Sequence, residues 1–546
     1  MTKTSMTFNL ADLFESVADT IPDRNAIVCS ERRLSFSELD DRATRLANCW
    51  AGLGIGHGDH IGLQLRNGSE FLEAMLAAFK LRAVPINVNY HYVEGELEYL
   101  YNDADMVALV VHQAFAPKVA AVVDRVEKLA HVFCVADQST EEVAAQFIDY
   151  EGALASGSSS RDFPQRGSDD IYIVYTGGTT GMPKGVMWHH RDLFFASLGG
   201  GDSDRSGNLI TEPEQLAERV VPQGMTILPI PPFIHAAAQW ISLGILFGGG
   251  KVVISKEGAF EPEAIWQCVN DEQVQMLILV GDAMATPLSD TLEANPGRWN
   301  SSSVFMIASG GALFSPVAKK RLLGYLPGAM IMDALGASET GVMGSKISST
   351  ANADDREPRF QVNEHMTVLN EENAIIEPGT GEIGKLARKG HVPIGYYNAP
   401  EKSASTFVDI AGERWAIPGD LATVEADGTI LLHGRGSVSI NTGGEKVFPE
   451  EVESVVKEHD DIFDAVVVGV DDELYGQKVV AVCQTRSGDS IELAQVREHC
   501  RSNLANYKLP RAVACVDKIR RSPAGKADYP WAKETAIRVL GEREKT

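Results

Sequence analysis

The segment Tyr175-Thr176-Gly177-Gly178-Thr179-Thr180-Gly181-Met182-Pro183-Lys184-Gly185 is the most informative stretch of the chain. It follows an apolar, β-branched run at 171–174, which predicts a strand. Three glycines and three threonines in one turn can place backbone N–H groups and hydroxyls around phosphate oxygens, and Lys184 adds a positive charge. It is not a Walker A loop, because Lys184 lies three residues after Gly181, and it contains no GxGxxG. The segment therefore predicts a phosphate-binding loop of another kind.

Around this loop, strand-like and helix-like segments alternate, which is typical of α/β layers. Ser35 and Glu38 form a capping-box pattern at the start of an amphipathic helix. From about 346 to 435 the pattern changes to short β-like runs with Gly and Pro turns, which predicts a β-rich module. We expect a large N-terminal domain at 1–435 and a small α+β domain at 436–546. The small domain should contain a helix from Pro449, strands at 465–470 and 478–483, and a helix near 491–502.

Composition narrows the class of protein. The chain has 546 residues, of which 44% are hydrophobic and 23% charged, as expected of a globular protein with a large core. A net charge of −26 disfavours nucleic acid and anionic membranes as partners. Residues 501–546 are basic, with eleven Lys and Arg against five Asp and Glu. That end either suits a polyanionic small ligand or carries chance surface charge.

Location can be inferred from the cysteines and the hydrophobic pattern. Seven scattered cysteines without CxxC spacing favour a reducing cytoplasm over a disulfide framework or a structural zinc site. We expect no transmembrane segment, because no window approaches about 18 consecutive apolar residues. The N-terminal residues lack the features of a signal peptide.

The phosphate-loop segment resembles that of the adenylate-forming superfamily, which includes acyl-CoA synthetases, luciferases and peptide-synthetase adenylation domains. The resemblance covers essentially the whole chain in the right order. Leu335-Gly336-Ala337-Ser338-Glu339 is similar to the family's Tyr-Gly-x-Thr-Glu motif, and Gly419-Asp420 to its Gly-Asp motif. Further matches are Gly434-Arg435, the stretch 443–453, Ala505-Asn506-Tyr507-Lys508-Leu509-Pro510-Arg511 and Ser522-Pro523-Ala524-Gly525-Lys526. The nearest type is the fatty-acyl or steroid-side-chain acyl-CoA synthetases of actinobacteria.

The resemblance implies roles for residues that suit them chemically. Glu339 would hold Mg²⁺ on the phosphates of ATP, because a hard cation prefers carboxylate oxygen. Asp420 would bind the ribose hydroxyls, with Arg435 nearby, and Lys526 would stabilise charge between the carboxylate and the α-phosphate. The expected catalytic residues are Lys526, Glu339, Thr176 and Lys184. The expected nucleotide and CoA contacts also include Gly177, Gly178, Thr179, Thr180, Gly181, Gly310, Gly311, Ala312, Asp333, Ala334, Leu335, Gly336, Ser338, Asp420, Arg435, Gly443, Gly444, Glu445 and Lys446.

Three positions depart from the family pattern. Leu335 stands where most relatives have a Tyr against the adenine, so stacking is lost although an aliphatic wall can still bury the ring. Ser338 replaces Thr and keeps a hydroxyl. Ser437 or Val438 stands where many relatives have a hinge Asp or Lys, and a β-branched Val is stiffer. None of these changes removes a charged catalytic group.

Free CoA is the expected acyl acceptor, since the loop 443–446 is of the acyl-CoA synthetase type. An amino-acid adenylation domain would present an Asp near the start of its pocket region, and 231–240 contains no acid. This favours an apolar acid, either fatty or a bulky steroid side chain, with a small aryl acid as the alternative. The expected acid pocket is Phe233, His235, Ala236, Ala237, Gly281, Asp282 and Gly310, with Ala238 and Gly244 leaving room for a tail.

Two other possibilities stay open at this point. A non-catalytic relative that binds nucleotide or acyl-AMP would be compatible with Leu335 and Val438, although the retained charged residues argue against it. His235 either lines the acyl channel or is a structural histidine. The resemblance also implies a homodimer.

Overall fold

The computed structural model describes residues 6–543 except 177–181, 203–206, 256–259, 313, 354–356, 443–444, 473–475, 502 and 523–524. A five-stranded parallel sheet lies in the N-terminal half, in the order β4-β3-β5-β6-β7. Its central strand β5 (Met106–His112) is almost entirely buried, as expected of a parallel strand covered on both faces. The other strands are β3 (His60–Gln64), β4 (Val84–Asn87), β6 (His131–Val135) and β7 (Ile148–Asp149).

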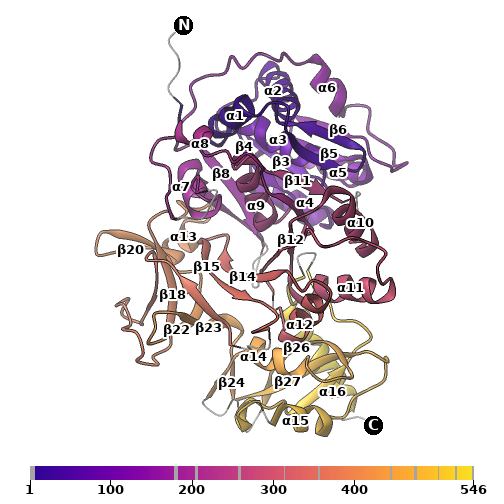
Figure 1. Cartoon of the computed structure of the whole chain (residues 1–546), viewed down its shortest axis with the longest axis vertical. Helices are drawn as coiled ribbons and strands as arrows, with labels where there is room; N and C mark the ends of the chain where they lie inside the picture. The colour runs from indigo at the N-terminus through magenta and orange to yellow at the C-terminus, as the bar shows by residue number, and fades with distance from the viewer. Residues whose placement is uncertain are drawn as a thin grey trace.

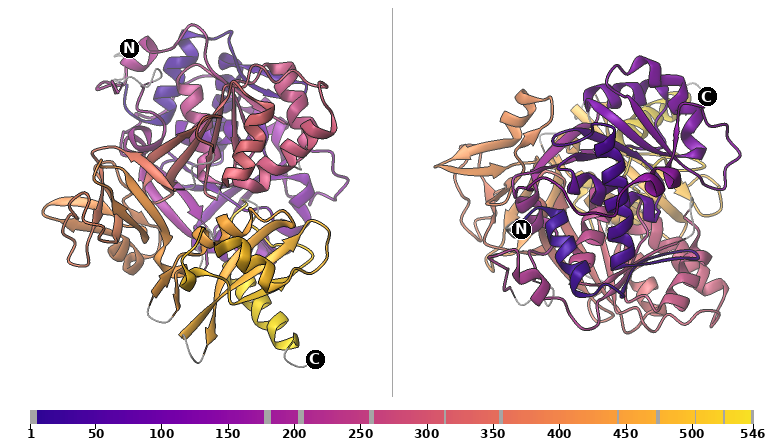
Figure 2. Two further views of the ribbon diagram at one scale, coloured as in Figure 1. Left: turned by 60° about the horizontal axis from the view of Figure 1, so that its bottom comes forward. Right: turned by 90° about the horizontal axis from the view of Figure 1, so that it is seen from above.

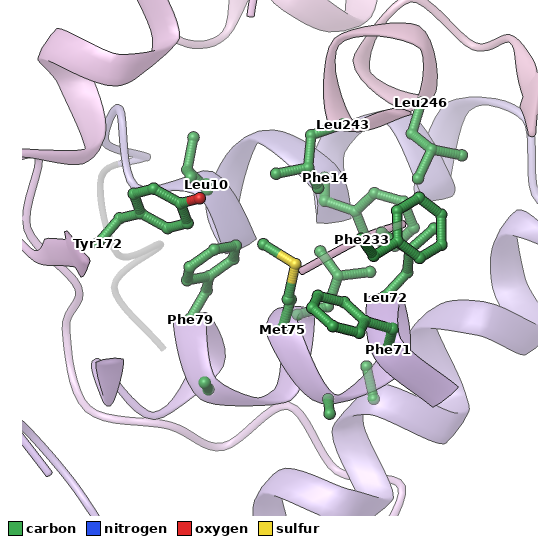
Figure 3. Close-up of a cluster of buried hydrophobic side chains, with 14 of the residues drawn as sticks. Leu10, Phe14, Phe71, Leu72, Met75, Phe79, Tyr172, Phe233, Leu243 and Leu246 are labelled. Atoms are coloured by element: carbon green, nitrogen blue, oxygen red, sulfur yellow. The ribbon is translucent and has the colours of Figure 1, made fainter. Parts of the chain in front are cut away.

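Helices α1 (Leu10–Thr20), α2 (Phe36–Gly52) and α3 (Ser69–Lys80) pack together beside this sheet, at the top of Figure 1. The predicted capping box is confirmed, because the Ser35 hydroxyl accepts the Glu38 N–H at 3.2 Å and the Glu38 carboxylate accepts the Ser35 N–H at 2.8 Å. Between these helices lies a cluster of buried apolar side chains that includes Phe14, Phe71 and Phe79 (Figure 3). This core fixes the framework on which the next sheet is built.

The largest sheet has fifteen strands and changes character along its length. Its first part is mainly parallel, and its strands β10 (Thr226–Pro229), β12 (Met276–Leu279), β13 (Met306–Gly310) and β14 (Met330–Ala337) run side by side. From β15 (Gly341–Ser348) onward every pairing is antiparallel. This part forms the orange layer of Figure 1. Its strands are β16 (Arg359–Val362), β17 (Met366–Leu369), β18 (Gly384–Lys389), β20 (Phe407–Ile410), β21 (Glu413–Ala416), β22 (Asp420–Val424) and β23 (Ile430–Arg435).

A smaller sheet carries the predicted phosphate loop. Strand β8 (Ile171–Thr176) pairs antiparallel with β9 (Lys184–His189), so that Thr176 and Lys184 face each other across the two strand ends. The connecting residues Gly177, Gly178, Thr179, Thr180 and Gly181 lie outside the described part of the chain. The strand predicted before the loop is therefore confirmed.

The C-terminal part, residues 440–543, has its own five-stranded sheet and lies below α11 (Gly281–Ala294) in Figure 1, and Figure 2 shows it in orange to yellow. The predicted elements are present as α14 (Pro449–Val456), β26 (Ile462–Asp472), β27 (Gly476–Thr485) and α15 (Leu493–Arg501), followed by α16 (Tyr529–Arg543). The change of sheet falls between β23 and β24 (Ile440–Thr442), whereas the domain boundary at 435/436 stays a prediction. No helix in the described ranges combines the length and apolar character needed to cross a membrane.

Candidate active site

A cavity of about 1290 Å³ lies along the parallel strands of the large sheet. At the carboxyl ends of the strands it is lined by Val280, Gly310 and Gly311, and at their amino ends by Gln275 and Phe305. Ligands of α/β proteins bind at the carboxyl ends of strands, and this cavity extends from there along the strands to their amino ends. The five steps from Gln275 to Val280 correspond to roughly 16 Å at a rise of about 3.3 Å per residue.

Helix α9 (Ala236–Phe247) forms the facing wall and runs opposite to the strands. The helix begins shortly after Pro231, at the carboxyl end of β10. It ends near the amino ends of the strands, because the Ile245 carbonyl accepts the N–H of Gly250 at 2.8 Å, and Gly250 directly precedes the parallel strand β11 (Lys251–Ile254). The cavity side is lined by Ala237, Ile241, Gly244, Ile245 and Gly248. The eleven steps from Ala237 to Gly248 span about 16 Å at ~1.5 Å per residue, which agrees with the strand estimate.

Lys526 and the predicted phosphate-loop residue Thr176 both line this cavity, near the carboxyl ends of the strands. A β-carbon added to Gly311, whose φ is +82°, would lie 3.5 Å from Lys526 Cε, so the lysine lies directly against this glycine. Gly310 lacks room for a side chain, since a β-carbon there would be 3.2 Å from the Ala334 carbonyl oxygen. Of the residues predicted to contact nucleotide, the lining includes Thr176, Gly310, Gly311, Ala334, Leu335, Gly336 and Ser338. The ammonium therefore lies where the predicted acid and nucleotide sites meet.

Glu339 follows this lining and is oriented by a tyrosine. The Tyr396 hydroxyl donates to Glu339 Oε1 at 2.9 Å, and the Trp188 indole donates to the Ser338 carbonyl at 3.0 Å, which anchors the preceding residue. In the described ranges no cluster of three or more His, Cys, Asp or Glu side chains could form a metal site by itself. One oriented carboxylate nevertheless suits Mg²⁺, which is usually bound by one or two carboxylates together with phosphate oxygens.

The predicted ribose residues lie on the antiparallel part of the sheet. Asp420 begins β22 and is paired in the strand register with Arg435 at the end of β23. The carboxyl of Glu450 lies against Gly434, the residue before Arg435, because a β-carbon at Gly434 would be 2.6 Å from its Oε2. Burial raises the pKa of Glu450 to about 7, and the negative charges of Glu453 and Asp420 add to the effect. This region is therefore sensitive to charge.

His235 lies at the carboxyl end of the cavity, immediately before α9. Burial lowers its pKa to about 4, and the positive charge of Lys526 lowers it further. Its Nε2 has no hydrogen-bond partner within the described ranges. The imidazole is therefore neutral at physiological pH, and its Nε2 is buried. The predicted role of His235 in the acyl channel stays a prediction.

One pocket prediction about α9 differs from the structure. Ala237 is exposed to the cavity, whereas Ala238 is completely buried in the core and does not line it. A β-carbon at Gly244 would lie 3.1 Å from the Leu198 carbonyl oxygen. Gly244 lines the cavity and also permits close approach of the chain at Leu198.

Several other predicted residues do not line the cavity. Phe233 is buried in the core, where its ring lies 5.4 Å from that of Phe71 (Figure 3). Gly281 and Asp282 lie beyond the wall that Val280 forms. Asp333 is paired with Lys319 at 2.5 Å, and Ala312 packs against a core cluster.

The predicted CoA loop consists of residues 443–446. Gly443 and Gly444 lie outside the described residues, and only the backbone of Glu445 and Lys446 is described, in β25 (Glu445–Val447). The roles assigned to these residues stay predictions.

Sequence reasoning missed residues that organise the site from a distance. Asn87 donates to the carbonyls of Tyr175 and Ile234 at 2.8 and 2.6 Å and accepts the Tyr175 N–H at 2.7 Å. It thereby ties the strand before the phosphate loop to the segment that carries His235. Tyr396, which orients Glu339, is 57 residues away along the chain. Neither residue belongs to a local motif that could have indicated it.

Comparisons with known proteins agree with this geometry. Residues 14–397 match the family "AMP-binding enzyme" and residues 451–526 match "AMP-binding enzyme C-terminal domain". A 3-oxocholest-4-en-26-oate–CoA ligase of Rhodococcus rhodochrous is 46% identical over 544 residues, covering 98% of each chain. A medium/long-chain-fatty-acid–CoA/3-oxocholest-4-en-26-oate–CoA ligase of Mycobacterium marinum is 44% identical and covers 97% of each.

A solved structure supports the same assignment. ATP-bound MatB from Rhodopseudomonas palustris has a TM-score of 0.80 and 25% identity, over 97% of this chain and 99% of that one. The predicted α/β fold with a large N-terminal and a small C-terminal domain is confirmed. The chain therefore belongs to the AMP-binding enzyme family, the adenylate-forming ligases that its phosphate-loop segment and later motifs predict.

Proposed function

We propose that this enzyme is an AMP-forming acyl-CoA synthetase for a long or bulky apolar carboxylic acid. The observation that carries the proposal is the cavity, which holds Lys526 at one end and continues about 16 Å along the sheet and α9. A small aryl acid would leave most of that length empty. The relatives named above act on 3-oxocholest-4-en-26-oate and on medium- or long-chain fatty acids, which agrees with the length of the channel.

The first step joins two anions. A carboxylate oxygen attacks the α-phosphorus of ATP, the new O–P bond forms, and the bond to the β-phosphate breaks with pyrophosphate as leaving group. Lys526 would lie between the carboxylate and the α-phosphate, where it stabilises the charge that develops. Bound Mg²⁺ would neutralise phosphate charge, and Glu339, oriented by Tyr396, would hold it. Thr176, Lys184 and the loop between them would hold the phosphates, while Asp420 and Arg435 would bind the ribose.

The second step forms the thioester. The CoA sulfur attacks the acyl carbonyl, the C–S bond forms, and AMP leaves with the electrons of the C–O bond. No acid stands in 231–240, so the site lacks a partner for the amino group of an amino acid. The neutral His235 would line the acyl channel close to this carbonyl. Residues 443–446 would contact CoA, and the basic C-terminal end would attract its phosphates.

The far end of the cavity supports a steroid-type acid over a plain fatty acid. Gln275 Oε1 accepts the Thr226 N–H at 2.9 Å, so its NH₂ group remains a donor where the side chain lines the cavity. Arg219 also lines this cavity. A donor remote from Lys526 suits an acid whose tail ends in a carbonyl oxygen. The two-domain division at 435/436, the cytoplasmic location and a homodimer complete the proposal.

A screen of acids tests this assignment. Purified enzyme receives ATP, Mg²⁺ and CoA with fatty, bile-type, steroid-side-chain or aryl acids, and CoA consumption and pyrophosphate release are measured. We expect the highest kcat/KM with a steroid-side-chain or long fatty acid and low values with aryl acids. A preference for small aryl acids would refute the assignment of the acid. Binding of ATP without acid-dependent pyrophosphate release from any acid would favour a non-catalytic sensor.

A further inference from the structure

The segment that carries Lys526 is held by contacts within the C-terminal part. Ser522 N–H donates to the Lys526 carbonyl at 2.9 Å, and Arg521 forms an isolated β-bridge with Ala527. The Arg521 guanidinium donates to the Gly525 carbonyl at 3.1 Å and to both oxygens of Asp464, each at 2.7 Å. A bidentate contact of this kind fixes the orientation of both partners. Arg521 therefore couples the Lys526 segment to strand β26.

The carboxylate of Asp464 also contacts Lys457, which in turn lies close to Asp282 of the large N-terminal part. Lys457, directly after α14, lies 3.3 Å from Asp464 and 3.8 Å from Asp282. Its side chain is only 5% exposed. Asp282 lies in α11 (Gly281–Ala294), and its Oδ1 accepts the Ser315 N–H at 2.8 Å. Asp282 and Lys457 thus form an ion pair between the two parts of the molecule, a role other than the pocket contact predicted for Asp282.

The ion pair between Asp282 and Lys457 lies beside the segment that carries Lys526. Burial alone would raise the pKa of Asp464, but the positive charges of Lys457 and Arg521 have the larger combined effect and hold its pKa below the ordinary value. A β-carbon at Gly525 would lie 3.2 Å from Val280 Cγ1 and 3.4 Å from Ala283 Cβ. The Lys526 segment therefore packs on the first turn of α11, beside Asp282. Any movement of the C-terminal part that withdraws Lys526 from this turn would also separate Asp282 from Lys457.

We propose that Asp282 and Lys457 are positioning residues that hold Lys526 in the cavity and act selectively in acyl-adenylate formation. The proposal rests on the proposed two-step function. Adenylation joins a carboxylate to a phosphate and needs a cation between two anions, whereas the thioester step attacks an acyl carbonyl that carries no formal charge. An orientation that delivers Lys526 matters chiefly to the first step. Arg521 and Asp464 belong to the same part as Lys526 and position it locally.

The decisive variant is Asp282→Asn, because an amide oxygen can still accept the Ser315 N–H while the charge facing Lys457 is removed. We expect kcat for acid-dependent pyrophosphate release to fall about tenfold or more, with KM values little changed, because Lys457 keeps Asp464 as a partner in the C-terminal part but loses the charge on α11 that attracts it to the large part. Conversion of preformed acyl-AMP and CoA should stay within about twofold. Lys457→Met should also lower the rate of pyrophosphate release. Because the two residues form one pair, the double variant should be no less active than the less active of the two single variants. Equal losses in both steps, or no loss in either, would overturn the proposal.

A matched control separates position from general damage. Asp290, on the same helix, pairs with Arg321 inside the large part, and Asp290→Asn should leave both steps unchanged. Spin labels at Ala294 in α11 and Glu534 in α16 give a readout that needs no turnover. Asp282→Asn should broaden the distance distribution, and an unchanged distribution would contradict the positioning role. If wild-type enzyme forms no acyl-AMP from any acid, the proposed function fails, while the spin-label result still decides whether the ion pair holds the two parts together.

Discussion

A bulky residue introduced at successive depths of α9 should shorten the acids that the enzyme accepts. Ala237 and Ile245 both line the cavity and lie eight residues apart, which is about 12 Å along the helix axis. Ile245→Trp should therefore block only acids whose tail reaches the amino ends of the strands. Ala237→Trp, close to His235, should impair much shorter acids as well.

The magnitude follows from the cost of overfilling a packed space, which is about 1–3 kcal/mol. At about 1.4 kcal/mol per factor of ten, kcat/KM for a steroid-side-chain or long-chain acid should fall roughly 5- to 140-fold in Ile245→Trp. The value for a short fatty acid should change less than about twofold. Pyrophosphate release measured over a series of acid lengths gives these ratios. Ile245→Val, which keeps an apolar wall, serves as the control.

Equal losses for short and long acids in Ile245→Trp would refute the reasoning. That result would show that α9 does not line the tail along its length. Unchanged activity with the longest acid would refute it as well, because the tail would then lie elsewhere in the cavity.

Three further predictions concern charge. Glu339→Gln should lose most acid-dependent pyrophosphate release, because an amide is a weaker ligand for Mg²⁺, and near wild-type rates over a Mg²⁺ titration would remove Glu339 from the metal site. Lys526→Ala should lower adenylation by about 10²-fold or more and keep most conversion of preformed acyl-AMP, since one electrostatic donor contributes ~2.7–4 kcal/mol; parallel loss of both steps would contradict this. Glu450 has a pKa raised from 4.5 to about 7, so the folded protein retains its proton longer and stability falls as pH rises through that window. Glu450→Gln should abolish this decrease and gain about 3 kcal/mol above pH 7, and identical pH profiles of thermal unfolding in the two proteins would show that the shift is absent.

Much of the chemistry could be predicted from the sequence because it depends on residue types in short segments. The strand before the phosphate loop, the capping box at Ser35 and the helix from Pro449 arise from local backbone preferences, and all three are present in the structure. Lys526 and Thr176 were assigned to one site by ordered motifs, and they line one cavity. Glu339 directly follows that lining.

Tertiary structure decided which of several neighbouring residues line the cavity. Ala236, Ala237 and Ala238 read alike in the sequence, yet Ala237 faces the cavity while Ala238 is buried, because packing of Leu243 and Leu246 in the core sets the rotation of α9. Asp282 was predicted to line the pocket and instead pairs with Lys457, which lies 175 residues later in the chain. The length of the cavity was not readable from any segment, since it depends on how far α9 follows the strands it faces. The sequence by itself determined the candidate reacting groups, because they belong to short ordered motifs, and packing between distant segments determined the shape of the cavity and the contacts that hold Lys526 in place.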